Sequence, residues 1–441
     1  MLTVDMGYGH QRAAYPLKDI AYKGVIAVND YQGLPASERK TWKTSREGYE
    51  IISRLKGKSA IGNALFGMFD RIQEIPRFYP KRDLSRPNLQ LTHTYHQIEK
   101  EGLCKHLFEK VLSKNNKIPL VCTFFMPAFA AEHYGYPGTI YLTVCDADVS
   151  RSWAPRDAQQ SRIKYLAPNK RVVERLMLYG VKEENIFLTG FPLPKENIGP
   201  DLKILKKDIG ARIVNLDPHQ RSMHKFGHIL SYHLGKKNIP KRATHPLTLT
   251  FAVGGAGAQR EIGAQILESL KTKIIRGKID VNIVAGTRKE VIKYFEGVIK
   301  DIGLSKELKN SVRIIEGETK DEYFRNFNKV LRTTDVLWTK PSELSFYTAL
   351  GIPIIMAPSV GSQEDFNRVW LKTIAGGIAQ NDPRYTDEWL MDWVDSGWLA
   401  RAALNGFSEA PITGTYVIEK LVLGHLTEVS EPEGEVESNL V

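Results

Sequence analysis

The chain has 441 residues, of which 42% are hydrophobic, 10% aromatic and 25% charged. These fractions lie near the averages of soluble globular proteins and exclude a disordered, collagen-like or coiled-coil chain. The net charge is +11, and residues 427–441 hold five Glu but no Lys or Arg, so 61 Lys and Arg face 45 Asp and Glu in the rest, a net charge of +16. A basic excess suggests anionic partners such as phosphate esters, nucleic acid or an anionic membrane face, the alternative being a solvated basic surface with no partner, and the acidic end is expected to be a disordered tail.

Cysteine spacing and hydropathy limit the cellular compartments in which the protein is expected. The three cysteines, Cys104, Cys122 and Cys145, have no Cys-x-x-Cys spacing, which favours a reducing compartment over a disulfide framework or a thiolate zinc site. The longest uncharged runs, 118–131 and 344–363, are too short or too often broken by Gly and Pro for a membrane span. The amino terminus lacks the basic region of a signal peptide. We expect a cytoplasmic protein.

Short apolar runs alternate with longer amphipathic runs along the chain, which is typical of βα units on a mostly parallel sheet. The clearest helix of the first half, Lys170–Tyr179, follows the capping residue Asn169 and ends before Gly180. Strands of the first half are predicted near Leu2–Asp5, Val25–Asn29, Pro119–Phe125, Thr139–Val144, Ile163–Ala167 and Asn185–Thr189.

The second half begins a new series after residues 196–245, which are rich in Lys, Arg and His and which we interpret as a basic interdomain connection. Strands are predicted near Pro246–Val253, Asp280–Ala285, Ser311–Ile315, Asp335–Thr339 and Pro353–Ala357. Trp-rich helices over 385–426 are expected to cross back over the first domain. The sequence thus predicts an α/β fold with two Rossmann-like doubly wound domains, 1–195 and 246–384, facing a cleft.

The sharpest motif is a Gly-rich turn between the strand 246–253 and a predicted helix Arg260–Lys271. Small residues let backbone N–H groups approach an anion, and the helix terminus adds about half a positive charge. A diphosphate suits such a loop, the alternative being a tight turn that only packs. A dinucleotide is disfavoured because Arg260 interrupts Gly-x-Gly-x-x-Gly and the next strand ends without an acid for a ribose. The donor side then includes Gly254, Gly255, Ala256, Gly257, Gln259 and Arg288.

A similar turn follows the first strand, where Gly7 and Gly9 precede His10. At a helix amino terminus the dipole disfavours the imidazolium and leaves a neutral ring available as general base; the alternative is a structural histidine. Past the fourth strand, Asp146 and Asp148 resemble the metal-binding Asp-x-Asp of nucleotide-sugar enzymes. One of these acids could instead orient a substrate hydroxyl or pair with Arg151 or Arg156.

Further polar groups follow two late strands. Such carboxylates, amides and hydroxyls bind sugar hydroxyls, and ligands of open α/β sheets lie at the carboxyl ends of strands. The residues concerned are Lys340, Ser342 and Glu343, then Gln363, Glu364 and Asn367.

Over about residues 1–380 these motifs together resemble the GT-B glycosyltransferases of family 28, which include MurG-like peptidoglycan enzymes and the monogalactosyldiacylglycerol and diglucosyldiacylglycerol synthases. The resemblance implies that His10 is base or acceptor contact, that Asp146 with Trp153 faces the acceptor, and that the loop 254–257 binds the donor diphosphate. It likewise matches Asp335 through Pro341 to the segment Ala-Asp-x-x-x-x-Lys-Pro-Gly-Gly, and Gln363, Glu364 and Asn367 to the residues that hold the donor sugar.

Two departures from the family fall at the nucleoside-binding step. The family Gly-Gly after Lys-Pro is Ser342-Glu343 here, and Thr348 stands where the family has a ribose-binding Glu. Glu343 is the candidate replacement. The segment Arg54–Arg82 interleaves aromatic and basic residues, as does the family region that sits on the membrane near a lipid acceptor; a buried core stripe is the alternative.

The resemblance implies an inverting glycosyltransferase that moves a sugar from a nucleoside diphosphate donor, UDP-linked in our interpretation, to a hydroxyl acceptor, a lipid being one candidate. His10 or Asp146 would be the base, with no metal and no cofactor. The alternatives are a UDP-sugar 2-epimerase of the same fold, a non-catalytic nucleotide-sugar-binding protein and a metal-dependent GT-A transferase. We expect no nucleic-acid partner, and a cytoplasmic protein that can be peripheral on the inner face of the membrane.

Overall fold

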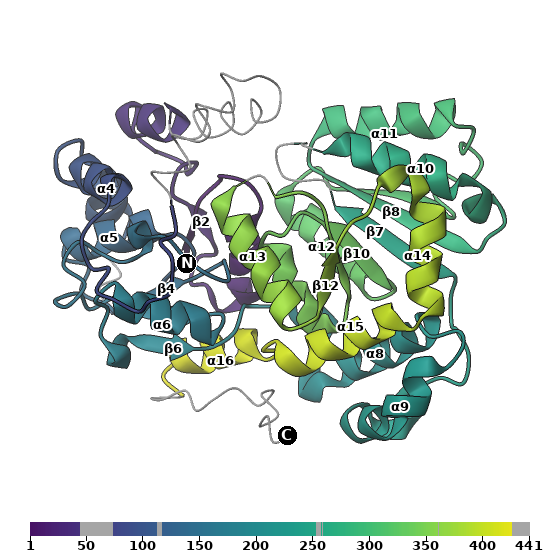
Figure 1. Cartoon of the computed structure of the whole chain (residues 1–441). Coiled ribbons are helices and arrows are strands. Elements are labelled where there is room, and N and C mark those ends of the chain that lie inside the picture. Colours follow the sequence, from purple (N-terminus) through teal and green to yellow (C-terminus); the bar gives the residue numbers. More distant parts are fainter. Residues whose placement is uncertain (45–73, 113–116, 253–256, 258, 360, 426–441) are drawn as a thin grey trace. The chain divides into compact units, whose positions relative to one another are not determined.

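The computed structural model describes every residue except 45–73, 113–116, 253–256, 258, 360 and 426–441. It contains two compact units (Figure 1). Apart from those gaps, unit 1 comprises Met1–Pro192, Val360–Asn367 and Thr413–Glu433, and unit 2 comprises Leu193–Ser359 and Arg368–Ile412. The acidic tail predicted over 427–441 lies outside the described residues.

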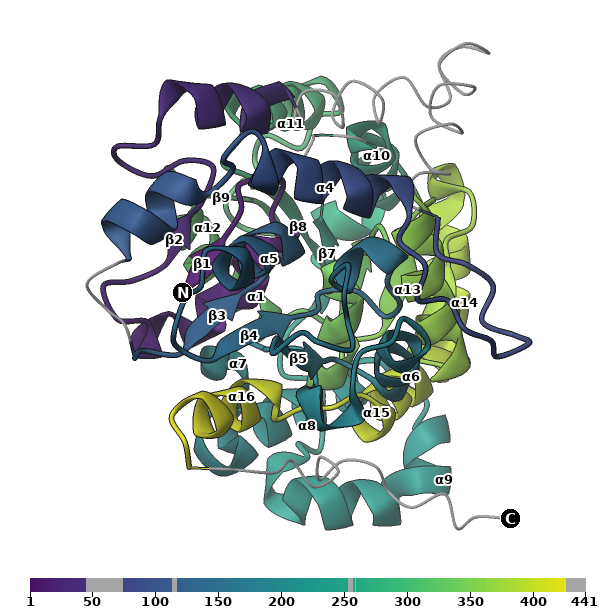
Figure 2. The same ribbon diagram turned by 90° about the vertical axis from the view of Figure 1, so that its left-hand side faces the viewer.

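Unit 1 is built on a six-stranded sheet in the order β2-β1-β3-β4-β5-β6, and every neighbouring pair is parallel (Figure 2). All six strands predicted for the first half are confirmed, each shorter than expected by one to four residues. Their bounds are β1 (Leu2–Thr3), β2 (Ile26–Ala27), β3 (Leu120–Cys122), β4 (Ile140–Thr143), β5 (Lys164–Ala167) and β6 (Ile186–Leu188).

Helices connect these strands, and the predicted cap is confirmed: the side chain of Asn169 accepts a hydrogen bond from Val172 N at the start of α6. The connections are α1 (Gly9–Ala14), η1 (Tyr15–Ile20), α4 (Leu89–Glu99), η2 (Leu107–Val111), α5 (Phe125–His133), η3 (Arg151–Trp153), α6 (Lys170–Leu178) and η4 (Glu183–Asn185).

The last helix, α16 (Gly414–Val422), belongs to unit 1 although the chain reaches it from unit 2. Ile418 and Leu421 of α16 are buried in one apolar cluster with Leu17, Val121 and other residues of the first half. Burial of these aliphatic side chains stabilises the packing of α16 on unit 1. The predicted crossing-back is confirmed for this helix.

Unit 2 contains a second parallel six-stranded sheet, in the order β12-β11-β10-β7-β8-β9. The five strands predicted here are confirmed. The sixth was missed, because β12 has three residues and begins at Gly377 after another glycine, a sequence without a strand pattern. The bounds are β7 (Leu247–Ala252), β8 (Ile279–Gly286), β9 (Val312–Glu316), β10 (Val336–Thr339), β11 (Ile354–Met356) and β12 (Gly377–Ala379).

Helices α10 and α11 and the later connections surround this sheet (Figure 1). Helix α13 contributes its residues up to Asn367 to unit 1 and those from Arg368 to unit 2. The bounds are α7 (Lys195–Ile198), η5 (Pro200–Leu202), α8 (Lys203–Asn215), α9 (Arg221–Leu230), η6 (Ser231–Gly235), η7 (Lys236–Asn238), α10 (Arg260–Ile275), α11 (Lys289–Asp301), α12 (Lys320–Leu331), η8 (Glu343–Leu350), α13 (Ser362–Thr373), η9 (Pro383–Tyr385), α14 (Thr386–Asp395) and α15 (Trp398–Glu409).

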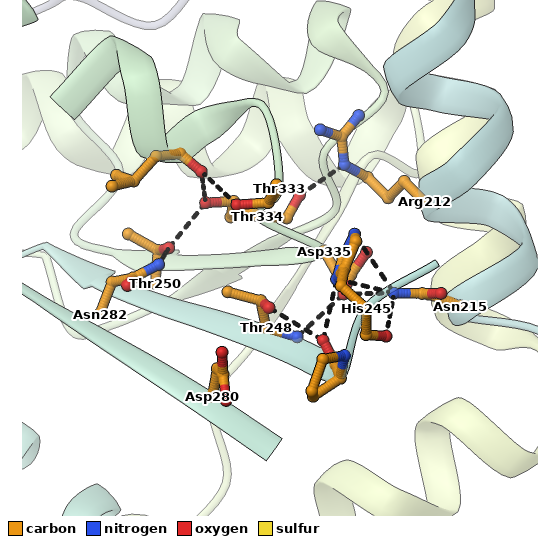
Figure 3. Close-up of polar contacts among 12 residues, drawn as sticks. Arg212, Asn215, His245, Thr248, Thr250, Asp280, Asn282, Thr333, Thr334 and Asp335 are labelled. Carbon is orange, nitrogen blue, oxygen red and sulfur yellow. Dashed lines mark hydrogen bonds and ion pairs between the residues drawn. The ribbon is translucent and has the colours of Figure 1, made fainter. Parts of the chain in front are cut away.

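Residues 196–245 differ from their interpretation as a separate connection, because they form α7 to η7 within unit 2. Arg212 of α8 shows why: its guanidinium is buried and donates to the carbonyl oxygen of Thr334 at 2.6 Å (Figure 3). It also donates to the carbonyl oxygens of Leu350 at 2.8 Å and Leu331 at 3.1 Å. The carbonyls of Leu331 and Leu350 end the helical segments α12 and η8, and that of Thr334 lies just before β10. A basic residue in this segment is therefore part of the core and not of a linker.

The predicted fold class, α/β with two Rossmann-like doubly wound units, is confirmed by the two sheets. In unit 2 the order corresponds to 3-2-1-4-5-6, and in unit 1 to 2-1-3-4-5-6. In such sheets the order reverses at one point, between β1 and β3 in unit 1 and between β7 and β10 in unit 2, and ligands bind outside the carboxyl ends of the strands there. Among the described helices, none is both long enough and apolar enough to cross a membrane.

Candidate functional site

In unit 1, His10 follows the strand at the reversal point. The side chain of Asn29 accepts from Asp5 N at 2.7 Å and donates to Asp5 O at 3.0 Å, which fixes the turn between β1 and α1. His10 is the second residue of α1, and its half-buried ring lies 4.8 Å from the ring of Phe124 and 6.1 Å from that of Trp153. Two residues predicted for the acceptor side, His10 and Trp153, are thus brought together, with Gly7 and Gly9 in the same turn.

Asp146, the second candidate base, follows β4 and is half-buried. Its Oδ1 accepts a hydrogen bond from Asn367 Nδ2 at 2.9 Å, while Asn367 Oδ1 accepts from Ala147 N at 2.7 Å. The carbonyl of Ala147 accepts from Asn169 Nδ2 at 3.1 Å. The turn that carries Asp146 is therefore held from both sides, and a residue predicted for the donor sugar, Asn367, is used to hold it.

Asp148 has a different position from the one predicted. Its carboxylate is 1% exposed and accepts two hydrogen bonds from the buried guanidinium of Arg175, at 2.8 and 2.9 Å. The two acids of Asp-x-Asp therefore have separate partners, and Asp148 stabilises the interior of unit 1 instead of lying on the acceptor side. Within the described residues no group of three or more His, Cys, Asp or Glu could hold a metal ion.

In unit 2, the Gly-rich turn follows β7 at the reversal point. Gly254, Gly255 and Ala256 lie outside the described residues. Gly257 has φ +71°, and a Cβ on it would come within 3.2 Å of Val291 Cγ2, so this position favours glycine. Gln259 precedes α10 in the left-handed region, φ 66°, and donates from Nε2 to Pro358 O at 2.7 Å, which joins the start of α10 to the loop after β11.

Arg288 follows β8, the neighbour of β7, and precedes α11. Its half-exposed guanidinium donates to Glu290 Oε1 at 3.4 Å, a long contact that leaves further donors of the fork available. Arg288 and Gly257 thus follow adjacent strands, on the edge of the sheet where the resemblance puts the donor.

Lys340, Ser342 and Glu343 follow β10 on the other side of β7. All three are half-buried, whereas the next seven residues of η8 are buried. Thr348, which occupies the position of the family ribose-binding Glu, is 0% exposed and donates from Oγ1 to Gly376 O at 3.4 Å. Thr348 is therefore a packing residue, and Glu343 is the first acid that follows this strand in the chain.

Gln363 and Glu364 begin α13, in the part of the helix that belongs to unit 1. Gln363 is half-buried, whereas Glu364 is 7% and Asn367 0% exposed. Asn367 bonds to Asp146 and Ala147 of unit 1, which its resemblance to a donor-sugar motif did not predict.

Asp335, which the resemblance matches to the start of the Lys-Pro motif, precedes β10, whereas Lys340 follows it. Figure 3 shows Asp335 beside Thr248, Asn215 and His245. Its Oδ2 accepts from Thr248 N at 2.9 Å and from Asn215 Nδ2 at 3.1 Å, and lies 3.6 Å from His245 Nδ1. Burial raises the pKa of this carboxyl to about 6, against the opposing effects of His245 and these donors. Asp335 fastens the amino ends of β7 and β10 to α8 and takes no part in the candidate site.

Much of the basic-aromatic segment lies outside the described residues, which resume at Glu74. Ile75 and Phe78 are 4% and 7% exposed, and the ring of Phe78 packs 3.8 Å from the guanidinium of Arg171. For these two residues the core alternative holds. Tyr79 is 67% exposed.

Sequence reasoning missed Phe124 and Asn29, which support the turn around His10. Both stand at the ends of predicted strands, 119–125 and 25–29, so the rule that places ligands at carboxyl strand ends could have found them. Gln259 was predicted, but its bond to Pro358 spans 99 residues and has no local signal.

A domain family described as "Domain of unknown function (DUF6938)" matches residues 236–383, about a third of the chain, which include all six strands of unit 2. No match was found among curated protein sequences.

Three solved structures illustrate the structural likeness. S. aureus MnaA with UDP is 14% identical; the match covers 85% of this chain and 89% of the MnaA chain, with a TM-score of 0.42. N. meningitidis UDP-GlcNAc 2-epimerase bound to UDP-GlcNAc is 13% identical, with 77% and 84% covered and a TM-score of 0.44. Acinetobacter baumannii MurG is 12% identical, with 86% and 95% covered and a TM-score of 0.42. We rest the fold assignment on the strand orders and registers of the two sheets.

Proposed function

We propose that the chain is an inverting glycosyltransferase that moves a sugar from a UDP-linked donor to a hydroxyl acceptor. One observation carries the proposal: in each unit, predicted residues follow the strands at which the sheet order reverses, His10 after β1 and Gly257 after β7. Open α/β sheets bind their ligands at such points. On the resemblance to family 28, unit 1 holds the acceptor and unit 2 the donor.

The donor diphosphate is assigned to the Gly-rich turn before α10. The amino terminus of this 16-residue helix adds positive potential, and glycines in the sequence before it have no side chains that would block approach to their backbone N–H groups. The same groups would stabilise the negative charge that develops on the departing diphosphate. This chemistry needs neither a metal nor a cofactor in the proposal.

The acceptor hydroxyl is assigned to the side chains of His10 and Asp146, one of which removes its proton as the bond to the sugar carbon forms. Aromatic rings of Phe124 and Trp153 back the imidazole, and Asn367 orients the carboxylate. A sugar ring or an aliphatic acceptor gains apolar contact from such rings.

The direct test measures UDP release from a panel of UDP-sugars, with and without hydroxyl acceptors that include lipids. We expect UDP release that requires an acceptor and persists in excess chelator. His10→Ala or Asp146→Asn should lower turnover by about 10²–10⁴-fold with UDP binding retained, whichever residue is the base. His96→Ala, an exposed histidine of α4, is the matched control.

Two results would contradict the proposal. Conversion of a UDP-sugar to its 2-epimer without any acceptor would identify an epimerase of the same fold. Binding of UDP with no turnover of any donor in the panel would identify a nucleotide-sugar-binding protein without catalysis.

A further inference from the structure

Unit 2 carries an exposed cationic surface on α9 and on the turns that follow it. The chain contains no Asp or Glu from Pro218 to Arg260. We call this surface the α9 cationic surface, and its exposed basic residues are Arg221, Lys225, Lys236, Lys237, Lys241 and Arg242. Among the ion pairs of the described residues, none involves these six side chains.

Two apolar side chains stand among these charges. Ile229 is 45% exposed and Tyr232 is 84% exposed. In a helix, residues four apart lie on one face, so Arg221, Lys225 and Ile229 form one outward stripe, which Tyr232 extends by about a turn. Leu230 and Leu234 are each 1% exposed and pack inward. The outward face is therefore both cationic and partly apolar.

The surface is held firmly by its own unit. The carboxylate of Asp217 accepts from Ser222 N and Met223 N, each at 2.9 Å, which caps the start of α9. Ser222 Oγ donates to Gly397 O at 2.9 Å, which ties α9 to the start of α15. In Figure 1, α9 lies at the edge of unit 2, on the far side of α8 from β7.

The counter-charges near this surface are few. His219, just before α9, pairs with Asp395 of α14 at 3.3 Å. Asp217 is buried and used by the cap, while His224 and His228 of the outward face are exposed and add no negative charge. The electrostatic field of the surface is therefore positive, which attracts anionic partners.

We propose that the α9 cationic surface docks unit 2 on an anionic lipid surface. Lysines attract a negatively charged bilayer as diffuse charges, and four of the six cations are Lys. Exposed Ile and Tyr side chains gain free energy when they enter the boundary between headgroups and acyl chains. A nucleic acid fits this surface less well: Tyr232 could stack on a base, but the aliphatic Ile229 could not, and only two of the six cations are Arg forks for phosphate. The inference does not depend on the reaction that the chain catalyses.

The test is flotation of the full chain with phosphatidylcholine vesicles, with and without 30% phosphatidylglycerol. We expect binding to the anionic vesicles alone, weakened by salt. Each lysine near a bilayer contributes about a fivefold gain in partitioning, so Lys225→Ala, Lys236→Ala and Lys237→Ala together should lower it roughly a hundredfold. Ile229→Ser with Tyr232→Ser should lower it at least about fivefold at unchanged charge.

The matched control removes three exposed lysines of α11 in the same unit, Lys289→Ala, Lys293→Ala and Lys300→Ala, and should leave partitioning within about threefold of wild type. Melting temperatures of all variants should stay close to that of the wild type, because the changed side chains are exposed. Failure of the wild type to float with anionic vesicles overturns the proposal. Vesicle binding that is unchanged in the α9 variants also overturns it. The proposal likewise fails if these variants lose only the binding of a single-stranded oligonucleotide, measured in parallel, and not the binding of vesicles.

Discussion

Asn367 Nδ2 donates a hydrogen bond to Asp146 Oδ1 at 2.9 Å, across 221 residues of sequence. The other end of the same amide accepts from Ala147 N at 2.7 Å. A single buried side chain thus spans the turn after β4 and fixes both the backbone and the carboxylate of a candidate base. The segment that resembles a donor-sugar motif therefore also acts as a structural part of unit 1.

This relationship predicts energetic coupling between the two residues. Asn367→Ala leaves the buried Ala147 N without its partner and should lower the free energy of unfolding by about 1–3 kcal/mol. In a double-mutant cycle, Asn367→Ala and Asp146→Ala should couple by about 0.5–3 kcal/mol in urea unfolding. Asp157→Ala, an exposed acid of the same unit, is the control and should be additive with Asn367→Ala. Additivity of the first pair would show that the contact is not made in solution.

Gly257 is predicted to be required for nucleotide binding. In Gly257→Asp a carboxylate would occupy the position assigned to the diphosphate, and its side chain would also meet Val291. UDP binding, measured by calorimetry, should be lost while the far-UV spectrum is kept. The control Gly297→Asp adds the same charge to α11, where a Cβ meets nothing within 4 Å, and should bind UDP normally. Undiminished affinity of Gly257→Asp would remove the diphosphate from this turn.

Much of the fold could be predicted because parallel strands that are buried on both faces have a local sequence pattern, an apolar run between turn residues. β8 shows this, since all eight of its residues are buried and its run stands out in the sequence. Strand β12 could not be found, because Gly377–Ala379 owes its strand conformation to pairing with Ile354–Met356 and not to its own composition.

The positions of the candidate site residues at strand ends could be predicted for a related reason. Residues at strand ends, such as His10 and Glu343, follow from the order of elements along the chain. The partners of the acids do not: the ion pair of Asp148 with Arg175 and the bond of Asp146 to Asn367 join segments far apart in the sequence. Which of two neighbouring acids faces inward is decided by such tertiary partners, and the sequence pattern Asp-x-Asp is the same in either case.

Glu343 is predicted to hold the donor ribose. A carboxylate that accepts from a ribose hydroxyl contributes about 1.5–3 kcal/mol, so Glu343→Gln should weaken UDP by roughly 10-fold to 150-fold. Binding of 2′-deoxy-UDP should weaken much less, because part of the interaction is already absent. Glu296→Gln, an exposed acid of α11, is the control. Equal losses for both nucleotides, with a slightly lower melting temperature, would mean that Glu343 only favours the start of η8.

Arg212 is predicted to be among the residues that unit 2 needs most for stability. Burial lowers the pKa of its guanidinium from the ordinary value, yet the side chain donates to three carbonyl oxygens, two of which end helical segments. Arg212→Met removes the guanidinium donors of these carbonyls, of which Leu331 O keeps a backbone partner, Thr334 N, and should lower the free energy of unfolding by at least about 3 kcal/mol. Lys207→Met, an exposed change on the same helix, should stay within about 0.5 kcal/mol of wild type. Similar stabilities in urea would contradict the assigned role.

Asp335 is predicted to make the stability of unit 2 depend on pH. Burial raises the pKa of this carboxyl from 3.8 to about 6 in the folded chain, so the folded state binds a proton more tightly than the unfolded state. Its contribution to stability is therefore fully present below about pH 4 and is lost as the pH rises through about 6. At 1.36 kcal/mol per pKa unit the change amounts to about 3 kcal/mol.

Asp335→Asn carries no titrating group, and its amide can still accept from Thr248 N. The difference in unfolding free energy between this variant and the wild type, measured in urea from pH 4 to pH 8, should shift by that amount in favour of the variant. Repeating the comparison with His245→Gln in both proteins removes the neighbouring imidazole. A difference that stays constant over this range would mean that Asp335 remains ionised in the folded chain.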